Sequence, residues 1–169
     1  MDGDRGAVIY LLRTAQQHHV QLSMMADQKA SALLAACFVA LSITITYAAG
    51  AGATLPILLI MLFALASALF AALAVMPRLD TDKRQGDVRN LLFFGDFAHM
   101  SWEEYADAAR PLLSCNDEAY EALLRDLYCL GRVLMQRKYR FLGLAYRCFI
   151  AGLLLAPAAW ALELLLAGA

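Results

Sequence analysis

One feature constrains this chain more than any other: the 48 residues of Ala30–Pro77 contain no Asp, Glu, Lys or Arg. A helix needs about 20 apolar residues to cross the hydrocarbon core of a membrane, so this run can hold two spans and a tight connection. Gly50, Gly52 and Pro56 punctuate it where a helix would end and restart. The run therefore predicts a first span over residues 30–49, an external hairpin over 50–54 and a second span over 55–76.

A third apolar stretch covers residues 141–166 and is interrupted only by Arg147 and Glu163. Arg147 would cost about 2.5–3.5 kcal/mol at the middle of a membrane, but it is only two turns into the stretch, where we expect it to snorkel. A soluble fold is disfavoured because so small a chain has too little amphipathic surface to enclose Ala30–Pro77. The fold class predicted is an all-α membrane protein with three transmembrane helices.

The placement of basic residues predicts the orientation. Three of the 14 Lys and Arg residues precede the first span, and the other eleven lie between the second span and Arg147. With three spans, all 14 fall on the same side of the membrane. Because loops rich in Lys and Arg stay cytoplasmic, we expect a multi-pass inner-membrane protein with a cytoplasmic N-terminus and an external C-terminus.

Two of the spans are expected to continue as cytoplasmic stalk helices. No Pro or Gly lies between Ala7 and Ala49, so a cytoplasmic helix over residues 1–29 should run directly into the first span. Asp27 and Lys29, at the mouth of that span, are expected to pair with each other. The stalk before the third span has apolar residues at every seventh position, which is typical of a packing seam. These residues are Tyr120, Leu127, Leu134 and Phe141.

A cytoplasmic helical module over residues 77–140 completes the predicted fold. It is small for an independent core, so we expect it to be stabilised by the N-terminal helix and by other subunits. Ser101 and Glu104 fit a capping box, which starts a helix predicted to end before Pro111. Ser114 or Asn116 is expected to cap the next helix, in which Gly131 is the weak point.

The sequence contains no recognisable catalytic constellation, and we expect no enzyme activity, no metal site and no cofactor. There is no Gly-rich phosphate loop, no H-E-x-x-H and no G-x-S-x-G, and the four cysteines lack a metal-binding spacing. A net charge of −1 gives no reason to expect a nucleic acid polymer as partner. What remains is a cytoplasmic binding surface, with Arg and Lys for anions and aromatic rings for stacking on bases.

Several short motifs resemble one known family in their order and spacing. They are Ala26-Asp-Gln-Lys-Ala-Ser31, Asn90-Leu-Leu-Phe-Phe-Gly95, Leu124-Arg-Asp-Leu-Tyr-Cys-Leu-Gly131 and Lys138-Tyr139. From about Tyr10 to Leu162 the chain resembles the Pycsar transmembrane effector domain. That resemblance implies an effector of a bacterial anti-phage system. A partner pyrimidine nucleotide cyclase makes cyclic UMP or cyclic CMP on infection, and the effector then impairs the membrane.

Candidate ligand-binding residues come from the motif positions together with their chemistry. They are Asn90, Phe93, Phe94, Arg125 and Lys138. Small residues along the second span permit close helix contact and predict a homo-oligomer in the lipid bilayer. We expect membrane disruption or a nonselective pore, because nothing in the spans looks like a selectivity filter. Two alternatives stay open: a ligand-independent membrane scaffold and a constitutive pore.

Overall fold

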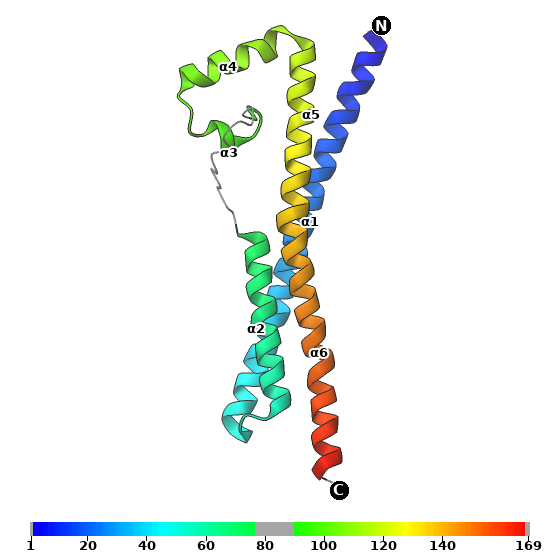
Figure 1. The fold of residues 1–169 in the computed structure, drawn as a ribbon, viewed down its shortest axis with the longest axis vertical. Helices are drawn as coiled ribbons and strands as arrows, with labels where there is room; N and C mark the ends of the chain where they lie inside the picture. Colours follow the sequence, from blue (N-terminus) through cyan, green and yellow to red (C-terminus); the bar gives the residue numbers. More distant parts are fainter. Residues whose placement is uncertain (1, 77–89, 168–169) are drawn as a thin grey trace. The chain divides into compact units, whose positions relative to one another are not determined.

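The computed structural model describes residues 2–76 and 90–167, which form helices joined by short turns (Figure 1). The elements are α1 (Asp2–Ala51), α2 (Leu55–Val75), α3 (Phe94–Phe97), α4 (Trp102–Ser114), α5 (Asn116–Val133), η1 (Leu134–Tyr139) and α6 (Arg140–Ala167). Three helical stretches among these residues are long and apolar enough to cross a membrane: Gly6–Ala51, Leu55–Val75 and Asn116–Ala167. The expected all-α fold with three membrane-length helices is therefore confirmed.

The break between the first two long helices lies where the glycines and the proline predict it. α1 runs without interruption to Ala51, and Gly52 then turns the chain with φ +91°, a conformation that favours glycine. Thr54 precedes α2, and Pro56 sits in the first turn, where its missing N–H costs no helical hydrogen bond. The predicted membrane boundaries within α1 and α2 stay predictions.

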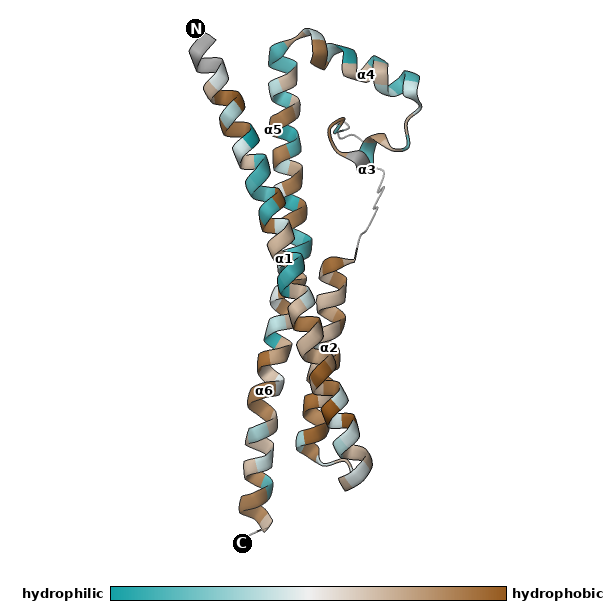
Figure 2. Ribbon diagram, turned by 180° about the vertical axis from the view of Figure 1, so that it is seen from behind, coloured by the Kyte–Doolittle hydropathy of each residue, from teal (hydrophilic) through white to brown (hydrophobic). Residues whose placement is uncertain are grey.

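The chain forms two compact units, each built from two segments. Unit 2 consists of Ser23–Met76 and Met135–Ala169, and its core is made of small side chains. Ala30, Cys37, Ala71 and Ala145 are each at most 1% exposed. Small residues let helix backbones approach closely, which is how helices associate in lipid. Figure 2 shows α2 as apolar along nearly its whole length.

Two contacts fix the register of α2 against α6 within unit 2. The Ser67 hydroxyl donates a hydrogen bond of 2.8 Å to the Ala145 carbonyl oxygen. About two turns further along α6, a Cβ added to Gly152 would lie only 2.7 Å from the Cβ of Phe63. The two antiparallel helices are therefore in close contact over this stretch.

Unit 1 consists of Met1–Leu22 and Pro77–Leu134. Its helix α4 begins with the expected capping box, since the Ser101 hydroxyl accepts from the Glu104 N–H while the Glu104 carboxylate accepts from the Ser101 N–H. The predicted end before Pro111 is wrong, because α4 continues to Ser114 around the proline. Proline removes only its own N–H, and the Pro111 carbonyl still accepts from the Cys115 N–H at 2.9 Å.

The start of α5 also differs from the prediction. Cys115, rather than Ser114 or Asn116, occupies the position before the helix, and its side chain makes no capping hydrogen bond. Gly131 does not interrupt α5, and the His19 side chain of α1 lies 3.4 Å from where a Cβ on Gly131 would be. Residues 77–89 of the predicted cytoplasmic module lie outside the described residues.

A π-helical segment, η1, joins α5 to α6 at the position where an ordinary α-helix was expected. The helix predicted from Asp117 into the third span is thus present, but the backbone hydrogen bonds change register for six residues. Single π-helical turns inside α-helices are rare and occur frequently at functional sites. Among its side chains is Lys138, one of the candidate ligand residues.

Candidate functional site

A buried carboxylate, Asp126 of α5, organises the polar interior of unit 1. Asp126 is 3% exposed, and Asn90 beside it is 4% exposed. The Asn90 side-chain amide donates to Asp126 Oδ1 at 2.9 Å, and the Gln16 amide of α1 donates to Asp126 Oδ2 at 2.6 Å. We call Gln16, Asn90 and Asp126 the Asp126 network. Through this network, two distant parts of the sequence, around Gln16 and Asn90, are hydrogen-bonded to the carboxylate of Asp126.

The Asp126 network also shapes the aromatic turn that follows Asn90. The Asn90 side-chain carbonyl accepts from the Leu92 N–H at 3.1 Å, as in an Asx turn. The Asn90 N–H donates to Asp96 Oδ2 at 3.0 Å, and the Phe93 N–H donates to the Asn90 carbonyl at 3.1 Å. These bonds lead directly into α3, whose last residue Phe97 lies 5.2 Å, centroid to centroid, from the ring of Tyr105 in α4.

Burial removes water from the Asp126 carboxylate, which costs free energy unless protein groups donate hydrogen bonds to it. Both oxygens accept from neutral amides, and within residues 2–76 and 90–167 no Lys or Arg forms an ion pair with it. A buried ionised carboxylate must keep its hydrogen bonds, since each bond to a charged group contributes about 1.5–3 kcal/mol. The side-chain amides of Asn90 and Gln16 are therefore needed as hydrogen-bond donors to this carboxylate.

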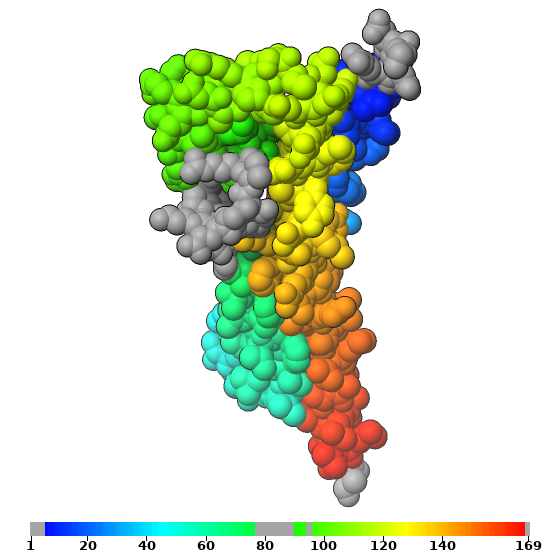
Figure 3. Space-filling model, turned by 45° about the horizontal axis from the view of Figure 1, so that its top comes forward, coloured from blue at the N-terminus to red at the C-terminus, as the bar shows by residue number. Residues whose placement is uncertain are grey.

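Arg125 lies next to Asp126 along α5 but has a different environment. Its side chain is 31% exposed, and its guanidinium contacts the Glu121 carboxylate at 3.3 Å, one turn earlier. Phe93 is half-buried, whereas the side chain of Phe94 lies outside what the structure describes. In the space-filling view, α4 and the start of α5 form a continuous surface of unit 1 (Figure 3).

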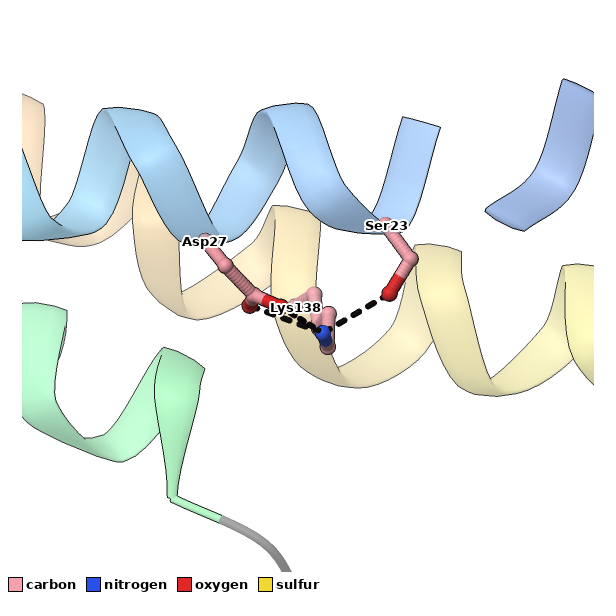
Figure 4. Close-up of polar contacts among 3 residues, drawn as sticks. All are labelled: Ser23, Asp27 and Lys138. Carbon is pink, nitrogen blue, oxygen red and sulfur yellow. Dashed lines mark hydrogen bonds and ion pairs between the residues drawn. The ribbon is translucent and has the colours of Figure 1, made fainter. Parts of the chain in front are cut away.

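The candidate Lys138 belongs to unit 2 and is fully engaged there (Figure 4). Its ammonium lies 2.7 Å from both carboxylate oxygens of Asp27 and 2.8 Å from the Ser23 hydroxyl. A lysine ammonium has three hydrogens, and all three have an oxygen acceptor here. We call Ser23, Asp27 and Lys138 the Lys138 cluster. The cluster connects the π-helical segment to α1. Asp27 therefore pairs with Lys138, whereas the sequence predicted Lys29 as its partner.

The five sequence-predicted residues thus separate into two groups. Asn90 and Phe93 share one turn, and Asn90 is bonded to the residue that follows Arg125. Lys138 lies in the other unit, in contact with Ser23 and Asp27. Sequence reasoning missed Gln16 and Asp126 as partners of Asn90, because nothing in the local pattern distinguishes them from solvated helix residues. Asp126 does lie within the Leu124–Gly131 motif, which is the signal that could have indicated it.

Among the described residues, no three His, Cys, Asp or Glu side chains gather in a way that could hold a metal ion. Four free thiols are present, of which Cys37 is buried. The polar groups described here are amides that donate to the Asp126 carboxylate and an arginine next to it along α5, and groups of these kinds bind and position ligands.

The chain matches a known protein family over most of its length. A family model described as the Pycsar effector protein domain matches residues 10–166, which is nearly the whole chain. No curated protein and no solved structure matches the chain. The matched range contains both polar clusters and the three membrane-length helices. The chain therefore belongs to the Pycsar effector family of cyclic-nucleotide-related anti-phage membrane effectors, which act in systems that include a cyclase.

Proposed function

We propose that this chain is a bacterial inner-membrane effector that is activated by cyclic UMP or cyclic CMP bound in its cytoplasmic region, residues 77–140. Activated copies oligomerise or rearrange and impair the integrity of the membrane, which stops the infected cell. The nucleotide comes from a partner pyrimidine nucleotide cyclase, with no need for direct contact between the two proteins. Membership of the Pycsar effector family supports this class of function.

The observation that carries the proposal is the position of Arg125 beside the Asp126 network. Arginine recognises phosphate through paired N–H donors, and aromatic rings stack on bases. Glu121 is 73% exposed, so its contact with Arg125 is open to solvent and a ligand phosphate can compete for it. Phe93 and Phe94 are the stacking candidates.

Asn90 and Lys138 act differently in this proposal. The Asn90 side-chain nitrogen donates to Asp126, and its side-chain oxygen accepts from the Leu92 N–H. Lys138 has no free donor because of Asp27 and Ser23. We therefore assign both residues positioning roles, Asn90 for the aromatic turn and Lys138 for the π-helical segment.

The signal reaches the membrane through a shift between conformations. A ligand can only shift an equilibrium by binding one arrangement more tightly than another. Arg125 lies on α5, which continues through η1 into α6 as one helical stretch, Asn116–Ala167. A change of hydrogen-bond register in η1 would rotate α6, and the Lys138 cluster would resist that rotation.

The experiment is isothermal titration of the detergent-purified full chain with cyclic UMP, cyclic CMP and cyclic AMP. We expect binding of a pyrimidine nucleotide, and a loss of at least about tenfold in affinity for Arg125→Ala, because a charged hydrogen bond contributes about 1.5–3 kcal/mol. Arg110→Ala is the matched control, since Arg110 pairs with Asp107 across an exposed turn of α4 in the same unit. Its affinity should equal that of the unsubstituted chain.

Dye leakage from liposomes separates the alternatives. Leakage that depends on the bound nucleotide is the expected result. Absence of binding by all three nucleotides would refute the sensor. It would favour the ligand-independent scaffold if the liposomes stay intact, and the constitutive pore if they leak without nucleotide.

A further inference from the structure

Arg147 of α6 is a charged residue on the outer surface of unit 2. It is exposed, and within the described part of the chain it makes no ion pair or hydrogen bond. Ala145, two residues earlier, is fully buried against α2. Two residues along an α-helix correspond to a rotation of about 200°. Arg147 therefore points away from α2, toward the outside of the unit.

The register of α2 against α6 gives the depth of Arg147. Ala145 is level with Ser67, and Gly152 is level with Phe63. Arg147 lies between these two contacts, so it is level with the stretch of α2 between Phe63 and Ser67. That stretch contains Leu65, the middle residue of Leu55–Val75.

With α2 as the predicted second span, Arg147 is near the centre of the bilayer. With a rise of about 1.5 Å per residue, α2 is about 31 Å long, which matches the hydrocarbon thickness of about 30 Å. Lys138 is nine residues from Arg147, or about 13 Å, which puts the Lys138 cluster at one membrane surface. Glu163 is 16 residues the other way, or about 24 Å, and therefore beyond the opposite surface.

A charge at this depth is costly when it faces lipid. Insertion measurements give about 2.5–3.5 kcal/mol for an arginine at the centre of a span, and such residues usually face a water-filled cavity or a helix interface. One face of a single helix cannot enclose water. The site of Arg147 is therefore incomplete without further copies of the chain.

We propose that Arg147 residues from several copies line a water-filled path for small inorganic anions such as chloride. In a parallel assembly every copy supplies its guanidinium at the same depth. A ring of arginines in a low-dielectric wall attracts anions and repels cations. The inference rests on the proposed membrane output and makes it specific: the pore that the sequence suggested to be nonselective is anion-selective.

The test is the reversal potential of the full-length protein in planar bilayers under a potassium chloride gradient, with and without each cyclic nucleotide. The unsubstituted chain should pass chloride severalfold better than potassium. Arg147→Lys should keep this preference, Arg147→Gln should bring the permeability ratio near unity, and Arg147→Glu should reverse it. Arg140→Gln is the matched control, because it removes the same charge from α6 seven residues nearer the Lys138 cluster.

Three outcomes would overturn the proposal: no current under any condition, current that does not distinguish chloride from potassium, or equal changes for Arg147→Gln and Arg140→Gln. Helical content and elution volume in detergent verify that each variant is folded. The titration with nucleotides is independent of these currents. Binding without selective current refutes the anion path and leaves the sensor intact, whereas selective current without binding refutes the sensor alone.

Discussion

At the scale of single residues, the stability of the fold depends on the hydrogen bonds that the buried Asp126 carboxylate accepts. Both of its donors are neutral amides, one from Asn90 and one from Gln16. Each carboxylate oxygen has one of these donors, so loss of either hydrogen bond leaves a buried acceptor unsatisfied. Asn90 has an additional structural role, since its side-chain carbonyl also accepts from the Leu92 N–H in the following turn.

Replacement of Asn90 by alanine should destabilise the protein by about 1–3 kcal/mol, because it removes one donor from a buried carboxylate. For a chain of this length, that corresponds to a fall of several degrees in the melting temperature. Thermal unfolding in detergent, followed by circular dichroism, measures it. Asn116→Ala is the control, since Asn116 is exposed at the start of α5 and should change the melting temperature little. Equal melting temperatures for the two variants would contradict this account.

The motif around Asn90 could be found in the sequence, but its role could not. Asparagine before two phenylalanines suggests ligand chemistry as readily as a turn, and only the fold shows that its amide is bonded to Asp126. Asp126 itself follows Arg125 in an ordinary amphipathic pattern. Burial of a polar residue is decided by elements distant in sequence, here α1 and the turn after Asn90, and local periodicity contains no information about them.

At the scale of helices, the sequence predicts length and apolar character well and the backbone hydrogen-bond register poorly. α2 begins at Leu55, as its flanking Thr54 and Pro56 indicate. The π-helical segment Leu134–Tyr139 was not predicted, because π and α turns differ in which backbone groups bond and have similar side-chain patterns. The close approach of α2 and α6 at Gly152 was likewise not predicted from the sequence, since a glycine in an apolar stretch does not by itself indicate a helix contact.

Gly152→Ala should weaken the packing of α2 against α6. The added Cβ would be 2.7 Å from the Cβ of Phe63, so the helices must separate, at a cost of about 1–3 kcal/mol. Gly143→Ala on the same helix has open space around the new methyl group and should be neutral or stabilising by up to about 1 kcal/mol. The difference in melting temperature between the two variants measures the effect. A more stable Gly152→Ala protein would show that the close contact is absent.

At the scale of the whole molecule, the number of crossings decides where the ends of the chain lie. If all three membrane-length helices cross, the termini lie on opposite sides, and the clustering of all 14 Lys and Arg residues predicts a cytoplasmic N-terminus. We expect a reporter that matures only in the cytoplasm to be fluorescent when fused before Met1 and dark when fused after Ala169. A reporter active only outside the inner membrane should give the reverse pattern. Fluorescence from both cytoplasmic fusions would require an even number of crossings.

The three oxygens around the Lys138 nitrogen have a practical consequence for following this protein in time. An amine-reactive acylating reagent must approach the nitrogen, and in the Lys138 cluster Ser23 and Asp27 occupy that approach. Lys29, which is exposed, provides an internal reference on the same molecule. Mass spectrometry of labelled protein should show slow acylation of Lys138 relative to Lys29 at rest. A rise in that ratio after addition of nucleotide would record the moment at which the π-helical segment separates from α1.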